Sequence, residues 1–181
     1  MDVLLDGNRV MGCATVIRRS FLPTLLPIPD QIPGYIYDGW LALVSAACGV
    51  IHFIDQPLQL YRTHPQQQVG VRPVAPNERV WLPDRLARHR AQKLIPLREK
   101  QAQLTTIGQL LAERVPADAP GLSLLHRRLA HFTMRSSLPS HRVQRLLPVL
   151  QSWQRGNYKR YADASANWYA PYLAALGDLL E

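Results

Sequence analysis

Short apolar runs alternate with turn-forming residues in the first seventy positions of the chain. Residues 10–17 form a β-branched and apolar run that predicts a buried strand, and residues 50–54 and 58–61 predict two more short strands. Between them, Asp38 precedes an apolar run that predicts a helix. Gly49 is expected to end this helix, because glycine readily adopts the left-handed conformation that follows a last helical turn.

In the second part of the chain, apolar residues recur with the period of an α-helix. Residues 66–76 are polar and contain proline, so we expect a linker there. Pro96 is expected to break or kink the helix that contains it, and Pro148 is expected to bend its helix. A last amphipathic segment is expected over residues 166–180. Apolar side chains recur every three or four positions at Leu104, Ile107, Leu110 or Leu111, Val115, Leu122, Leu125, Leu129 and Phe132.

Charge is distributed unevenly between these two parts. The chain has 181 residues, 47% of them hydrophobic, which is enough for a substantial core. Residues 1–70 carry four Arg and five Asp, a net charge of −1, whereas residues 71–181 carry seventeen Lys or Arg and eight Asp or Glu, a net charge of +9. The basic part favours an anionic partner such as a membrane surface; a solvated helical face is the simpler alternative. The basic residues do not alternate with aromatics in a nucleic-acid-binding pattern, which disfavours nucleic acid as a partner.

Cysteine use and the N-terminal residues indicate a cytoplasmic protein. Cys13 and Cys48 lie in apolar contexts without a CxxC pattern, so we expect buried, reduced thiols. Asp2 and Asp6 stand where a signal peptide would need basic residues. The longest apolar run, residues 41–51, is far shorter than the roughly 20 residues that span a bilayer. The protein is therefore expected to be cytoplasmic, with peripheral attachment to the inner face of the cytoplasmic membrane as a further expectation.

Three short motifs carry a family resemblance: Asn8-Arg9-Val10-Met11-Gly12-Cys13, then Tyr37-Asp38-Gly39-Trp40, then Tyr61-Arg62-Thr63-His64. Their order and spacing resemble the C-terminal part of inverting family-two glycosyltransferases of the GT-A fold, which build bacterial surface polysaccharides. The tail has a similar resemblance, carried by Leu138-Pro139, Arg142, Arg145-Leu146, Pro148-Val149-Leu150, Gly156, Tyr158, Arg160-Tyr161 and Asp178-Leu179. The resemblance implies an α/β remnant of a GT-A (nucleotide-diphospho-sugar transferase) domain over residues 1–70, followed by a mostly α-helical C-terminal region over residues 71–181.

The resemblance also assigns roles to individual residues. It makes Asp38 the catalytic base for the acceptor hydroxyl, and it places Gly12 and Cys13 at a turn beneath the sugar. The substrate-binding residues that it implies are Gly12, Cys13, Trp40 as a stacking ring, and Arg62 and His64 toward the diphosphate, with His64 also a candidate metal ligand. Each assignment has a simpler alternative: a helix cap for Asp38, strand packing for Gly12 and Cys13, core packing for Trp40, and a surface pair for Arg62 and His64.

The sequence departs from the family pattern in ways that bear on activity. Tyr37 replaces the usual His or Glu, Gly39 replaces an aromatic residue, and Gln67 stands where Asn is usual. No Asp-x-Asp motif occurs, so the donor-binding half and its metal ligands are missing. A divalent metal, Mg or Mn, is therefore expected only for a complete enzyme and none for this chain alone. We expect a partial glycosyltransferase, inactive by itself, that uses a nucleotide-sugar donor and a glycan acceptor; the alternative is a non-enzymatic basic helical module that binds a membrane surface or a protein partner.

Overall fold

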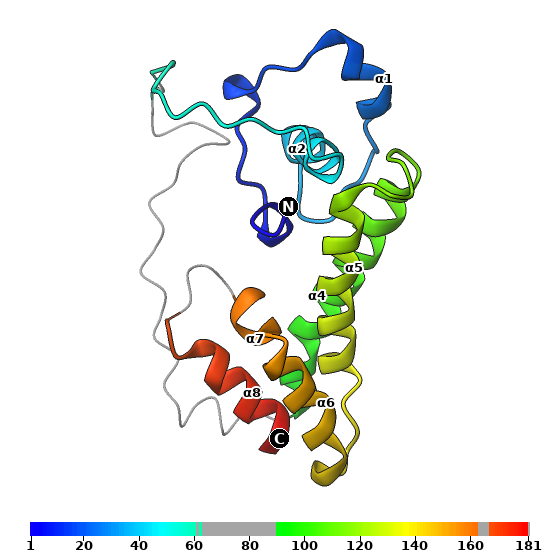
Figure 1. The fold of residues 1–181 in the computed structure, drawn as a ribbon, viewed down its shortest axis with the longest axis vertical. Coiled ribbons are helices and arrows are strands. Elements are labelled where there is room, and N and C mark those ends of the chain that lie inside the picture. Colours follow the sequence, from blue (N-terminus) through cyan, green and yellow to red (C-terminus); the bar gives the residue numbers. More distant parts are fainter. Residues whose placement is uncertain (61, 63–89, 163–166, 181) are drawn as a thin grey trace.

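The computed structural model describes residues 1–60, 62, 90–162 and 167–180 (Figure 1). The longer helices of this part are α2 (Tyr37–Ala47), α4 (Arg90–Ala112), α5 (Pro120–Ser136), α6 (Arg142–Gln154) and α8 (Ala170–Leu180). The shorter elements are η1 (Leu4–Asp6), η2 (Gly12–Ala14), η3 (Arg19–Phe21), α1 (Leu22–Leu25) and α7 (Asn157–Arg160). The expected linker over residues 66–76 lies outside the described residues.

The predicted α/β architecture is wrong for the part of the chain that the structure describes. That part has no β-strand, and its isolated bridge joins Ile32 to Tyr35. Residues 10–17 contain the single turn of η2 within extended backbone, and residues 50–60 have no regular structure. Met11 and Thr15, on either side of η2, have extended backbone. No other segment among the described residues supplies the ladder of hydrogen bonds that makes extended chain a strand, and side chains such as Val16 and Leu60 remain 98% exposed.

The structure confirms the helix that was predicted to follow Asp38, and this helix is α2. It begins at Tyr37 and ends at Ala47, just before Gly49, whose φ is +74°. The N–H of Gly49 bonds to the carbonyl of Ala46, and the next N–H, of Val50, bonds to that of Ser45. These bonds satisfy carbonyls that the end of the helix would otherwise leave without partners. The helix buries a face made of Trp40, Leu43, Val44 and Ala47.

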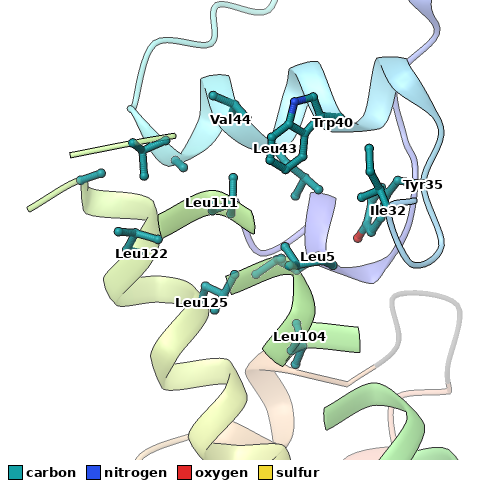
Figure 2. Close-up of a cluster of buried hydrophobic side chains, with 14 of the residues drawn as sticks. Leu5, Ile32, Tyr35, Trp40, Leu43, Val44, Leu104, Leu111, Leu122 and Leu125 are labelled. Carbon is teal, nitrogen blue, oxygen red and sulfur yellow. The ribbon is translucent and has the colours of Figure 1, made fainter. Parts of the chain in front are cut away.

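The larger hydrophobic core lies where α2 and η1 meet the paired helices α4 and α5 (Figure 2). The predicted apolar positions Leu104, Ile107 and Leu111 of α4 and Leu122 and Leu125 of α5 are all buried there. Side chains of α2 point toward Leu5 and this leucine layer. Each fully buried leucine stabilises the fold by about 1.5–3 kcal/mol. The core therefore joins residues on both sides of the boundary expected at residue 70.

Helices α6, α7 and α8 enclose a second, smaller core. Its buried members are Leu138, Val149, Tyr158 and Ala175. Helix α8 corresponds to the predicted last amphipathic segment. Helix α4 runs through Pro96 and α6 runs through Pro148, so neither proline ends its helix.

Candidate functional site

The first two sequence motifs meet at the carboxylate of Asp38, in the first turn of α2. Asp38 is 6% exposed. Its Oδ1 accepts hydrogen bonds from Nδ2 of Asn8 at 2.7 Å and from the N–H of Gly39 at 2.7 Å. Its Oδ2 accepts the N–H of Gly12 at 3.0 Å. Two donors from residues 8–12 and one from the adjacent Gly39 therefore hold this carboxylate in one orientation, at the positive end of the helix dipole.

Two glycines make this close approach of the segments possible. A Cβ on Gly12 would overlap the phenol of Tyr37, and a Cβ on Gly39 would lie 2.8 Å from a ring carbon of Tyr35 and 3.1 Å from the Asn8 side chain. A larger residue at position 39 would push the buried Tyr35 ring and Asn8 away from Asp38, whereas one at position 12 would turn the exposed Tyr37 ring aside. The glycine at position 39 thus has a local reason, because the Tyr35 ring fills the space that a side chain would need.

The remaining predicted site residues do not join this network. Cys13 is exposed, so the prediction of a buried thiol was wrong for it; it follows Gly12 in the one turn of η2, which does not reach the core. Trp40 is fully buried and donates its indole N–H to the carbonyl of Leu25 at 3.1 Å, which is the core role left open by the sequence. Arg62 is exposed, and His64 lies outside the described residues.

Asn8 is the participant that sequence reasoning missed. It heads the first motif but received no role, because its contact with Asp38 spans thirty positions. The available signal was the motif itself, which places Asn8 four residues before Gly12.

A second polar cluster lies between the two cores and was not predicted as a site. The buried guanidinium of Arg128 donates to the carbonyl of Asp2 at 2.7 Å and to the carboxylate of Asp6. Farther along α5, Nε of Arg135 donates to Oδ2 of Asp178 at 2.6 Å, and the Tyr158 hydroxyl donates to the same oxygen at 2.7 Å. These contacts tie the middle of α5 to η1, the C-terminal end of α5 to α8, and α7 to α8.

His131 lies within this cluster as a neutral side chain. Its Nδ1 lies 2.9 Å from Oγ of Ser152, and its ring packs edge-on against Phe132 and Tyr158. Burial lowers the pKa of His131 to about 3, and the positive charges of Arg135 and Arg128 contribute to the same shift. Burial and the Asp178 carboxylate raise the pKa of Tyr158, so its hydroxyl remains a donor at neutral pH. These groups are therefore suited to holding the helices together and not to proton transfer near neutral pH.

A cavity of about 570 Å³ opens beside the cluster, between η1 and helices α4, α5, α7 and α8. Its carboxylates, Asp6 and Asp178, are each paired with an arginine. Its basic lining residues are Arg9, Lys93, Lys100, Arg128 and Arg135. Among the described lining residues, basic side chains outnumber carboxylates, which suits an anionic group and opposes a metal cation. The described residues contain no group of three His, Cys, Asp or Glu side chains that could hold a metal ion.

Comparison with known proteins gives no relative for this chain: no family model, no curated protein and no solved structure matches it. Within the described ranges, none of the helices has the length and apolar character needed to cross a bilayer.

Proposed function

We propose that this chain carries the acceptor-activating part of an inverting glycosyltransferase, which moves a sugar from a nucleotide-diphospho-sugar to a cell-surface polysaccharide or lipid-linked acceptor. The observation that carries the proposal is the meeting of two separated motifs at one carboxylate, since Asn8 and Gly12 both donate to Asp38. These are the motifs that resemble family-two transferases. A general base must be held within reach of the proton that it takes, and the three donors hold Asp38 in place.

In the proposed reaction, Asp38 takes the proton of the acceptor hydroxyl as the hydroxyl oxygen forms a bond to the anomeric carbon. The bond between that carbon and the diphosphate oxygen breaks, and the nucleoside diphosphate leaves with the electron pair. Attack opposite the leaving group inverts the configuration. A carboxylate offers about four lone-pair positions. Asn8, Gly39 and Gly12 occupy three of them, which leaves a position on Oδ2 for the proton.

The donor end of the reaction is assigned by resemblance to Arg62 and His64, acting with a nucleotide-binding segment outside residues 1–181. The surroundings of Asp38 do not fit a divalent cation. N–H donors contact its carboxylate, whereas Mg²⁺ and Mn²⁺ require several oxygen ligands. Any metal that serves the complete enzyme is therefore expected to bind to that other segment. We place the reaction at the inner face of the cytoplasmic membrane, where a lipid-linked acceptor would be presented.

The test joins this chain to a nucleotide-binding segment of a family-two transferase and measures sugar transfer from a panel of nucleotide-diphospho-sugars to membrane glycolipids. In Asp38→Asn, the amide oxygen can keep the donors Asn8 and Gly39, but the amide nitrogen faces the N–H of Gly12. Leaving that N–H without an acceptor costs about 1–3 kcal/mol, so turnover is compared where melting curves show both proteins folded. We expect turnover to fall by about 10² to 10⁴.

Asp30→Asn is the matched control, because it makes the same chemical change at an exposed position outside the network. It should leave turnover unchanged. Near-normal turnover in folded Asp38→Asn would show that the carboxylate is only a structural tie between η2 and α2. Absence of transfer by the unsubstituted protein with every donor in the panel would reject the proposed function.

A further inference from the structure

Helix α6 is partly inverted: two polar side chains accompany Val149 on its buried face, and four apolar side chains lie on its outward face. Its buried positions include Arg145 and Ser152, which are only 3% and 6% exposed. Its outward face carries Val143, Leu146, Leu147 and Leu150, which are between 47% and 78% exposed. The spacing of these four residues places them along one side of the helix. We call this set of four side chains the α6 stripe.

The inversion follows from what the inner face of α6 must satisfy. Nε of Arg145 donates to the carbonyl of Pro139 at 2.6 Å, and Nη2 donates to the carbonyl of Ser140 at 2.8 Å. Ser152 lies against His131. Because these polar contacts fix the rotation of α6, its leucines point away from the protein. A continuous apolar row on an exposed helix is characteristic of a surface that docks onto something else.

The charge around the α6 stripe indicates what it docks onto. Residues 119–162, which include α5, α6 and α7, contain eight Lys or Arg and no Asp or Glu. Arg142 at the start of α6 and Arg155 at its end are exposed, as are Lys159 and Arg160 on α7. A second copy of the chain would bring this charge against itself, whereas an anionic membrane surface would provide the opposite charge and an apolar layer for the leucines.

We propose that α6 lies in the surface of an anionic lipid bilayer, with the α6 stripe inserted among the acyl chains and the flanking basic residues on the headgroups. Figure 1 shows α6 following the end of α5 that is distant from α2, so this surface is separate from the Asp38 network. The docking surface stands on the geometry of α6 and does not depend on the transferase activity. Vesicle binding and sugar transfer are measured separately, so one can fail while the other holds.

The test uses the full chain and vesicles of phosphatidylcholine alone or with about one-third phosphatidylglycerol, sedimented at low and high salt. We expect pelleting with the anionic vesicles only, and a decrease as salt rises. Leu146→Gln/Leu147→Gln changes two exposed side chains and should keep the helical circular dichroism. It should lower partitioning by about tenfold for each leucine that inserts. Arg142→Gln/Arg155→Gln should lower partitioning by about fivefold for each arginine.

The matched control is Leu58→Gln/Leu60→Gln, two exposed leucines of the irregular segment before residue 61. It should bind as the unsubstituted protein does. Equal loss in this control would show that any exposed leucine drives the binding, which overturns the assignment to α6. Equal pelleting with neutral vesicles, or none with anionic vesicles, also overturns it. Light scattering would also overturn it by showing a dimer that Leu146→Gln/Leu147→Gln dissociates and the control does not.

Discussion

Acid should destabilise this protein through His131 in particular. The ring is buried against aromatic side chains and lies between Arg128 and Arg135, so its pKa is held at about 3 in the folded state, against about 6.5 in the unfolded chain. Between these values the unfolded state binds the additional proton. The stabilising contribution is therefore complete above pH 6.5 and is lost progressively as the pH falls toward 3. At pH 5 the loss amounts to about 2 kcal/mol, which is large for a domain of this size.

Urea unfolding at pH 7.5 and pH 5, followed by circular dichroism, measures this loss. His131→Gln removes the titrating ring. Between pH 7.5 and pH 5, the free energy of unfolding of this variant should therefore fall by about 2 kcal/mol less than that of the unsubstituted protein. All other groups titrate alike in the two proteins and cancel. His126→Gln removes an exposed histidine from the same helix and should retain the full pH dependence. If the unsubstituted protein and His131→Gln lose equal stability, His131 is not buried as a neutral ring.

Two further changes test the packing and the thiols. Gly121→Ala should destabilise the protein by about 1–3 kcal/mol, because a Cβ there would overlap the backbone of Ala47 and push α5 away from α2. The control is Ser123→Ala, which changes an exposed position of α5. Equal melting temperatures for the two variants would refute the close contact. Maleimide labelling followed by mass spectrometry should modify Cys13 well before Cys48, since Cys13 is exposed whereas burial raises the pKa of the Cys48 thiol. Labelling at equal rates would contradict this placement.

The sequence was most informative where local signals and burial coincide. Helix α2 could be predicted from the acidic start, the apolar run and Gly49, which are all features of adjacent residues. The leucines of α4 and α5 could be predicted because a repeat of three to four residues fixes one face of a helix. In both cases the physical cause lies within one element.

The strands could not be predicted correctly from the same kind of signal. An apolar, β-branched run such as residues 10–17 shows that extended backbone is favourable, but a strand needs a partner that the run does not encode. At the candidate site, Gly12 and Asp38 were identified through motif resemblance. The donors that hold Asp38 depend on tertiary contacts across twenty-six and thirty positions. The inward turn of Arg145 depends on carbonyls of the turn before α6, and the burial of His131 depends on Ser152 and Tyr158 from other helices.

The ion pairs across α5 and α7 have a consequence for the order in which the chain can fold. The basic helices have no internal counter-ions, so Arg128 relies on Asp6 and Arg160 on Asp2, whereas Arg135 relies on Asp178. A growing chain already contains the first two carboxylates when α5 and α7 are made, but it reaches Asp178 only after both helices are complete. The N-terminal half of α5 can therefore settle during synthesis. The C-terminal half of α5 can form its ion pair, and α8 can complete the cavity wall, only after α8 has been made.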